Sequence, residues 1–164
     1  MTRNRKLSVL FVCLGNICRS PTAEGAFRQQ VQSHGLGEHI LVDSAGTGSW
    51  HLGKAPDTRA RAVAKAQGYS IDDLRARQVS AADFVKFDYI LAMDNSNLAA
   101  LDALKPESYA GHLGLFMDFA KHRGYREVPD PYYGGDDDFE QVVQLVHDAS
   151  QGLLTHICQQ HLGQ

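Results

Sequence analysis

Short apolar runs recur along the chain, separated by longer segments in which apolar residues have helical spacing. The first run, Leu7–Val12, is almost continuously apolar and rich in β-branched residues. Such a run is typical of a strand that is buried on both faces of a parallel sheet. Three further runs predict strands at His39–Asp43, Phe87–Met93 and His112–Met117.

Between these runs the chain carries signals for helix starts and stops. The first predicted helix begins with Ser20 as its cap and Pro21 in the first helical position, and it ends at Gly35. A second helix is predicted over Asp57–Gln67, before Gly68. The apolar face of the first helix consists of Ala23, Ala26, Phe27 and Val31.

Two more helices are predicted in the second half of the chain. Asp94 caps a helix over Asn95–Leu104, and Pro106 closes it. The last helix begins near Asp137, which can form a capping box with Glu140. Its apolar residues repeat at helical spacing: Phe139, Val142, Val143, Val146, Ala149, Leu153, Leu154 and Ile157.

Strands that alternate with helices predict an α/β fold, a three-layer sandwich with a parallel sheet flanked by helices. The chain has no internal repeat and no Pro/Ser-rich linker, so we expect one domain over residues 1–164. Ligands of such folds bind at the carboxyl ends of the strands. The loop that follows the first strand is therefore the first place to look for function.

Composition narrows the class of protein. The 164 residues are 43% apolar and 21% charged, which excludes collagen-like, coiled-coil and wholly disordered chains. A net charge of −3 disfavours a general nucleic-acid binder. The run Leu7–Leu14 is too short to span a membrane. An odd count of cysteines does not suit a secreted disulfide scaffold, so we expect a cytoplasmic protein without nucleic-acid or membrane partners.

The segment Cys13–Ser20, between the first strand and the first helix, has the form C-x5-R-S. A loop of this length can turn its amides inward, and the helix N-terminus adds its own N–H groups and its dipole. Gly15 and Asn16 tolerate the positive φ that such a loop needs. We therefore expect a phosphate or other oxyanion to be bound by the loop residues Leu14, Gly15, Asn16, Ile17, Cys18 and Arg19.

Within this loop Cys13 is the candidate nucleophile. The same local field stabilises a thiolate, which can attack a bound phosphoryl group, and Ser20 can hydrogen-bond the sulfur. Arg19 can hold two phosphate oxygens with its planar guanidinium. No Walker-type or dinucleotide-binding glycine motif is present, and no spacing of ligands suggests a metal site.

The loop sequence Val12–Pro21 resembles the signature of the low-molecular-weight protein tyrosine phosphatases. The resemblance continues in order along most of the chain, in Asp43-Ser44-Ala45-Gly46, Trp50-His51, Ala76-Arg77-Gln78, Met93-Asp94-x-Ser96-Asn97-Leu98 and Asp130-Pro131-Tyr132-Tyr133. It implies a four-stranded parallel sheet and hydrolysis of phosphotyrosine in proteins and of small aryl phosphates through a cysteinyl-phosphate intermediate. It implies no cofactor.

The resemblance also implies roles for single residues. Cys13 is the nucleophile, Arg19 binds the phosphate and Asp130 is the general acid. Asn16 and Ser20 support the loop and the thiolate. Trp50, Tyr132 and Tyr133 wall the substrate slot, and Tyr132 and Tyr133 are phosphorylated in some relatives.

Asp130 also suits its role on chemical grounds. A phenolate leaving group needs a proton, and the same carboxylate can then activate water. Pro129 and Pro131 hold its backbone extended. The nearby acidic residues Asp136, Asp137 and Asp138 stand at a helix start, where they are interpreted as capping and dipole partners. Asp94 is interpreted as a helix cap that also buttresses the loop.

One position departs from the family pattern. Many relatives have a histidine three residues before the arginine of Ala-Arg-Gln, and this chain has Leu74. The histidine is thought to hydrogen-bond the loop serine. It is therefore open which residue supports Ser20 in this chain, and Ser44 is the candidate.

Three rival functions share the scaffold. An arsenate reductase would need further redox cysteines, yet none lies between Cys18 and Cys158, and Cys158 is expected in the core. Arginine phosphatases tend to carry Thr where Ile17 stands. A non-catalytic phosphotyrosine-binding module would need neither Cys13 nor Asp130. We further expect a reversible Cys13–Cys18 disulfide under peroxide, and a monomer or weak self-association.

Overall fold

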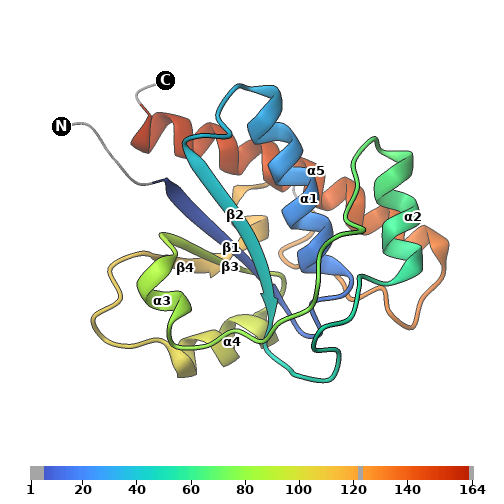
Figure 1. Ribbon diagram of the computed structural model, residues 1–164, viewed down its shortest axis with the longest axis horizontal. Coiled ribbons are helices and arrows are strands. Elements are labelled where there is room, and N and C mark those ends of the chain that lie inside the picture. The colour runs from blue at the N-terminus through green and yellow to red at the C-terminus, as the bar shows by residue number, and fades with distance from the viewer. Residues whose placement is uncertain (1–5, 122–123, 163–164) are drawn as a thin grey trace.

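The computed structural model describes residues 6–121 and 124–162. The four apolar runs form four strands: β1 (Leu7–Cys13), β2 (Ile40–Gly46), β3 (Tyr89–Ala92) and β4 (His112–Leu115). They make one sheet in the order β2-β1-β3-β4, and each neighbouring pair is parallel. The predicted α/β fold with a four-stranded parallel sheet is confirmed (Figure 1).

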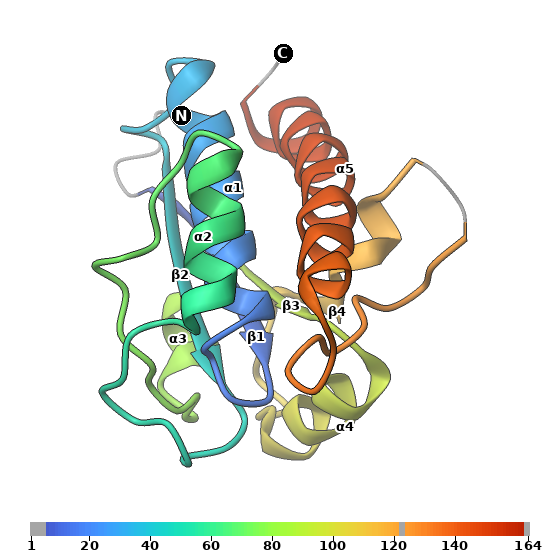
Figure 2. The same cartoon turned by 90° about the vertical axis from the view of Figure 1, so that its right-hand side faces the viewer.

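Helices cover both faces of this sheet. The helices α1 (Arg19–Ser33) and α5 (Asp136–His161) pack on one face, with α2 (Thr58–Ala66) beside them (Figure 2). The short helix α3 (Asp83–Lys86) and the helix α4 (Asn95–Leu104) lie on the other face. A 3₁₀ turn, η1 (Phe116–Phe119), packs against α5. The predicted three layers are present.

The central strand β1 is buried along its whole length because each of its faces meets a helical layer. Val9 and Phe11 belong to the core under α1 and α5, whereas Leu10 and Val12 belong to the core under α3 and α4. Phe11 meets Phe27 and Phe116 edge to face at centroid distances of 5.7 and 4.8 Å. Truncation of a phenylalanine at such a site costs about 3–5 kcal/mol.

Element boundaries differ from the predictions where the chain has both strand and turn signals. β2 continues to Gly46, three residues beyond its predicted end at Asp43, because Ser44, Ala45 and Gly46 keep pairing with β1. β3 and β4 are shorter than predicted. After β4 the chain turns into η1, which buries Phe116 and Met117. The short elements α3 and η1 have no signal in the periodicity, since each has only four residues.

Two predicted helix caps are wrong. α1 begins at Arg19 after Cys18, and the hydroxyl of Ser20 turns to the loop instead of capping the helix. α5 begins at Asp136 after Gly135, and the Asp138 carboxylate accepts from the Gly135 N–H in place of the predicted Asp137–Glu140 box. The Asp94 cap of α4 is confirmed, since its carboxylate accepts from the N–H of Asn97 at 2.8 Å.

The topology places a crevice at the C-terminal end of β1. The neighbours of β1 are β2 on one side and β3 on the other, so the connections diverge at this point. Cys13 is the last residue of β1. Among the described residues, no helix is long and apolar enough to cross a membrane.

Candidate active site

The loop that follows β1 wraps around the sulfur of Cys13. The N–H of Asn16 points to this sulfur at 3.3 Å, and the Ser20 hydroxyl lies 3.0 Å from it. Asn16 has a φ of 58°, as the loop prediction required. Gly15 does not have a positive φ, so that part of the prediction is wrong. A Cβ on Gly15 would lie 2.9 Å from the His51 ring, so a larger residue there would displace the His51 side chain.

The side chain of Asn16 ties the loop to β2 and to the segment around residue 77. Its Nδ2 donates to the hydroxyls of Ser20 at 2.8 Å and Ser44 at 3.1 Å. Its Oδ1 accepts from the N–H of Arg77 at 3.0 Å. The structure therefore brings Asn16, Ser20 and Ser44 together, as the sequence predicted for the loop support. Leu74 instead packs beside an apolar cluster that includes Ile17 and Cys18.

Arg19 reaches the cavity from the first residue of α1 and is only 3% exposed. Its Nη1 donates to the Asp94 carboxylate at 2.6 Å and to the Val128 carbonyl at 2.9 Å. Burial alone would lower the pKa of Arg19, but the negative charges of Cys13, Asp94 and Asp130 outweigh it and raise the pKa. The guanidinium is thus a fixed cation beside the sulfur.

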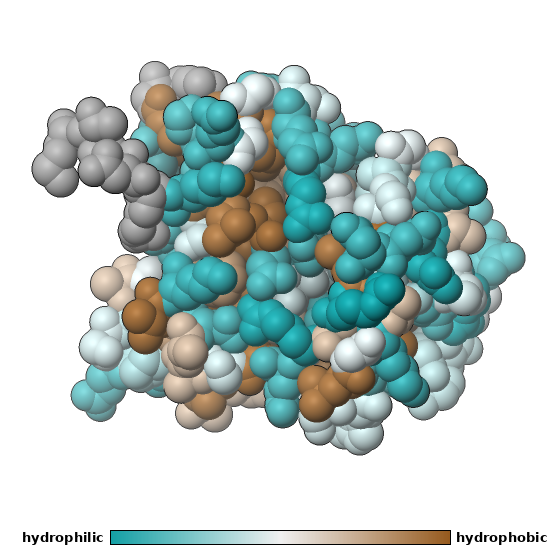
Figure 3. Space-filling view, in the orientation of Figure 1, coloured by the Kyte–Doolittle hydropathy of each residue, from teal (hydrophilic) through white to brown (hydrophobic). Residues whose placement is uncertain are grey.

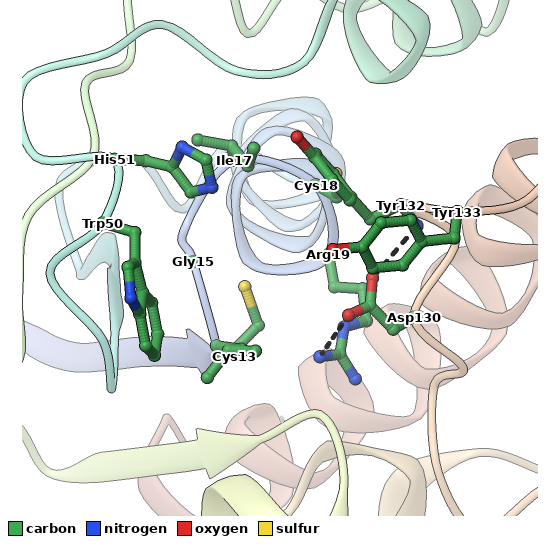
Figure 4. Close-up of a pocket in the computed structure, with 11 residues that line it drawn as sticks. Cys13, Gly15, Ile17, Cys18, Arg19, Trp50, His51, Asp130, Tyr132 and Tyr133 are labelled. Atoms are coloured by element: carbon green, nitrogen blue, oxygen red, sulfur yellow. Dashed lines mark hydrogen bonds and ion pairs between the residues drawn. The ribbon is translucent and has the colours of Figure 1, made fainter.

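Asp130 approaches from the far side of the cavity, on the loop before α5. Its carboxylate lies 3.7 Å from the second guanidinium nitrogen of Arg19 and also accepts from the N–H of Tyr132 at 3.1 Å. The Asp130 side chain is 44% exposed, so it faces solvent as well as the cavity. This places a carboxylate opposite the thiol across the space that a phosphate ester would fill (Figure 4).

The cavity has a volume of about 440 Å³, and Cys13, which lines it, is only 3% exposed. It is lined by Cys13, Leu14, Gly15, Ile17, Cys18, Arg19, Trp50, His51, Asp130, Tyr132 and Tyr133. Every predicted slot and catalytic residue is among these. Of the predicted phosphate-binding residues only Asn16 is absent from the lining, because its side chain turns to the support network.

Aromatic side chains form the rim of this cavity. The rings of Tyr132 and Tyr133 meet edge to face at 4.9 Å, and His51 lies 6.1 Å from Tyr132. Trp50 is 69% exposed, and its ring lies over Gly48, where any Cβ would collide with it.

The three cysteines occupy different environments. Cys18 lines the cavity, and burial raises the pKa of its thiol, with the charge of Asp57 acting in the same direction. Cys158 lies on α5 and is half-buried at the edge of the core, so its predicted core position is only partly right. It lines a different cavity from Cys13. Over residues 6–121 and 124–162, no group of three or more His, Cys, Asp or Glu could hold a metal.

Several residues at or behind the site were not predicted as site residues. His51 lines the cavity, the Val128 carbonyl and the Arg77 N–H orient key side chains, and Glu24 accepts a hydrogen bond from Ser44. Every residue has a backbone carbonyl and nearly every residue an N–H, so the sequence does not mark which of these groups will contact the site. Glu24 offered one signal, since it is a charged residue one position from Ala23 on the buried face of the predicted helix.

Fold and site together define a cysteine-dependent phosphatase scaffold of small size, and comparison with known proteins assigns the family. Residues 8–162 match the family model described as low molecular weight phosphotyrosine protein phosphatase. The chain belongs to this family, and the resemblance in the sequence is confirmed.

Individual relatives agree over nearly the full chain. The low molecular weight phosphotyrosine protein phosphatase of Schizosaccharomyces pombe is 47% identical and covers 96% of this chain and 99% of its own. A protein tyrosine phosphatase of Entamoeba histolytica, solved with Hepes in the active site, has a TM-score of 0.91 at 44% identity and covers 94% and 98% of the two chains. A Drosophila arginine phosphatase has a TM-score of 0.84 at 35% identity, and the match covers 90% of this chain and 96% of the Drosophila chain.

Proposed function

We propose a two-step route by which this protein, a low-molecular-weight protein tyrosine phosphatase, hydrolyses phosphotyrosine. The observation that carries the proposal is the convergence of the Cys13 thiol, the Arg19 guanidinium and the Asp130 carboxylate on a single cavity with an aromatic rim. Each group supplies a different need of phosphate-ester cleavage. These are a nucleophile, a charge clamp and a proton donor.

In the first step the Cys13 thiolate attacks phosphorus. A sulfur–phosphorus bond forms, and the bond from phosphorus to the phenolic oxygen breaks. The carboxylic acid of Asp130 gives its proton to that oxygen, so tyrosine leaves neutral. Arg19, held by Asp94 and the Val128 carbonyl, balances the charge on the phosphoryl oxygens.

In the second step water releases the phosphate. The Asp130 carboxylate takes a proton from the water as its oxygen attacks phosphorus. The sulfur–phosphorus bond breaks, and the Ser20 hydroxyl at 3.0 Å stabilises the sulfur as it leaves as a thiolate. Inorganic phosphate departs, and both catalytic groups return to their starting charge.

The substrate is a protein or small molecule that presents an aryl phosphate. The rim formed by Trp50, Tyr132 and Tyr133 favours a flat ring over the short side chain of phosphoserine. Hepes, found in the active site of the Entamoeba relative, carries a sulfonate, which has the shape and charge of a bound oxyanion. We therefore propose phosphate and similar oxyanions as ligands of the loop.

A panel of phosphopeptides tests this proposal. Matched peptides carry phosphotyrosine, phosphoarginine or phosphoserine, and phosphate release is measured in the presence of EDTA. We expect the phosphotyrosine peptide to be hydrolysed with the highest kcat/KM. The phosphoserine peptide should release phosphate only at the background rate. Preference for phosphoarginine would establish the rival phosphatase activity, and binding without release would establish the binding module.

The location in the cell stays a prediction. Cys13 and Cys18 are both free thiols in one cavity, and a reducing compartment preserves them. We therefore propose a cytoplasmic location, which subcellular fractionation would test. An arsenate reductase is disfavoured further because Cys158 lines a separate cavity.

A further inference from the structure

Glu24 is a carboxylate buried in the middle of α1, although it does not line the cavity. It is 3% exposed, which is rare for glutamate. One carboxylate oxygen accepts from the Ser44 hydroxyl at 2.7 Å, and the other pairs with the guanidinium of Arg28, one turn further along the helix. Arg28 also reaches the Val42 carbonyl of β2 at 3.3 Å.

These contacts begin an unbroken series of hydrogen bonds that ends at the nucleophile. Ser44 has one hydroxyl hydrogen, and giving it to Glu24 leaves the Ser44 oxygen free to accept from Asn16. The Asn16 amide uses its two hydrogens on Ser44 and Ser20, since its oxygen is held by the Arg77 N–H.

The end of the series fixes the role of Ser20. Its oxygen accepts from Asn16, so its own hydrogen is free for another acceptor. The Cys13 sulfur lies 3.0 Å from this oxygen, whereas the Ala45 carbonyl lies 3.4 Å away. The shorter contact directs the Ser20 hydrogen to the sulfur. Ser44 lies on β2, Asn16 on the loop, Ser20 in the first turn of α1 and Cys13 at the end of β1, whereas Glu24 lies one turn further along α1 than Ser20.

We propose that Glu24, paired with Arg28, is a positioning residue that sets the direction of the Ser44–Asn16–Ser20 hydrogen bonds and so keeps the Ser20 hydroxyl pointed at Cys13. This inference rests on the proposed function in that Cys13 is the nucleophile. It answers the question raised by Leu74. In this chain a carboxylate on α1 and a serine on β2 support Ser20 without an imidazole.

Replacing the Glu24 carboxylate by a neutral amide distinguishes the proposal from a direct effect of the Glu24 charge on the Cys13 thiolate. Burial raises the pKa of Glu24, while the bonds from Ser44 and Arg28 oppose that rise. If Glu24 acted only through its negative charge, Glu24→Gln would make a nearby thiolate easier to form. Under the proposal the amide keeps its oxygen on Arg28 and turns its NH₂ to Ser44. Ser44 then faces donors on both sides, and the series loses its direction.

The experiment follows the alkylation of Cys13 by iodoacetate across pH, with the modified residue identified by mass spectrometry. The midpoint is the pH at which the alkylation rate reaches half of its maximum. For Glu24→Gln and for Ser44→Ala we expect this midpoint to move up by roughly one pH unit, which means about tenfold less thiolate at a given pH below it. We expect kcat to fall about tenfold, comparable to the loss of one hydrogen bond, with KM nearly unchanged. The double variant should be no worse than either single variant.

The opposite end of β1 offers matched controls. There, far along the strand from Cys13, the Asp88 carboxylate accepts from the Ser8 N–H at 2.8 Å, and the Ser8 hydroxyl lies 2.8 Å from the Lys86 carbonyl and 3.2 Å from that carboxylate. Asp88→Asn and Ser8→Ala remove the same kinds of groups and should leave the midpoint unchanged. A midpoint that stays or falls in Glu24→Gln and Ser44→Ala overturns the proposal, as do additive effects in the double variant.

Two further outcomes remain interpretable. If Glu24→Gln does not fold, Ser44→Ala carries the test alone, and an unchanged midpoint in that variant overturns the proposal. Alkylation needs no substrate. A shifted midpoint in a protein that fails the phosphopeptide panel would therefore support Glu24 as a positioning residue while refuting the proposed substrate.

Discussion

The phosphate loop and the rim of the cavity are built in opposite ways. In the loop, the polar side chains of Asn16, Arg19 and Ser20 are buried, and each has hydrogen-bond partners. On the rim, Tyr133 is 95% exposed and Trp50 also faces solvent (Figure 4). On the face seen in Figure 3, apolar residues show between polar ones, some singly and some in contact with one another. Polar groups are thus enclosed at the base and apolar groups are exposed at the mouth, the reverse of ordinary burial.

The difference follows from the role proposed for each region. Stabilising charge on a phosphoryl group requires dipoles that are already oriented, because reorienting them during the reaction would cost free energy. Burial and mutual hydrogen bonds provide that fixed orientation. Selection among ring-bearing substrates requires contact area and access, which exposed aromatic side chains provide. Substitutions in the loop should therefore change kcat, and substitutions on the rim should change KM.

The largest effect is expected from Cys13→Ser. A serine hydroxyl is a far weaker nucleophile than a thiolate, so kcat should fall by more than about a thousandfold. Release of phosphate from an aryl phosphate measures this. Cys158→Ser is the matched control, since Cys158 lines a separate cavity, and it should keep the parent's rate. A Cys13→Ser variant that folds and hydrolyses at the parent's rate would remove Cys13 from the mechanism.

The next largest effect is expected from Asp130→Asn. The amide can keep the bond to the Tyr132 N–H but cannot donate a proton as an acid. We expect kcat on phosphotyrosine to fall about a hundredfold, with a smaller fall for aryl phosphates whose leaving groups need no proton. Rates across a series of leaving groups measure the difference. Asp136→Asn, at the exposed start of α5, is the control. Equal losses for all leaving groups would contradict the general-acid role.

Sequence reasoning was most successful where the local pattern determines the structure by itself. The burial of β1 follows from its apolar run, and the C-x5-R-S spacing places Cys13 and Arg19 on one loop because a strand precedes it and a helix follows. Helix α4 was predicted with its observed boundaries because Asp94 and Pro106 mark both ends.

The failures share a physical cause, which is tertiary contact that overrides local signals. Ser20 precedes a proline, as a helix cap often does, but the helix begins one residue earlier and the Ser20 hydroxyl lies 3.0 Å from the Cys13 sulfur. Gly46 suggests a turn, but it pairs with Cys13 at the end of β2. The role of Glu24 depends on Ser44, twenty positions away in the sequence. The pattern along a single segment does not contain such partners.

A redox prediction concerns the two thiols of the cavity. Peroxide oxidises the Cys13 thiolate to a sulfenic acid. The Cys18 thiol then attacks that sulfur, the disulfide forms and water leaves. Because burial raises the pKa of Cys18, this thiol stays protonated until then. In Cys18→Ser, we expect about tenfold less activity to return with dithiothreitol after mild peroxide. Mass spectrometry should find the Cys13–Cys18 bond in the parent, and recovery of only sulfinic Cys13 there would refute it.

The smallest effect is expected from Trp50→Ala, which tests the rim. Loss of one exposed aromatic wall should raise KM for a phosphotyrosine peptide roughly three- to tenfold, because ring contacts of this kind contribute about 0.5–1.5 kcal/mol. Since the loop is untouched, kcat should change less than about twofold. Steady-state kinetics on the peptide and on a small aryl phosphate separate the two constants. Tyr125→Ala removes another exposed aromatic residue that does not line the cavity, and it should leave both constants unchanged. If Trp50→Ala instead lowered kcat and left KM intact, the rim would take part in positioning the reacting atoms, and the division between loop and rim would fail.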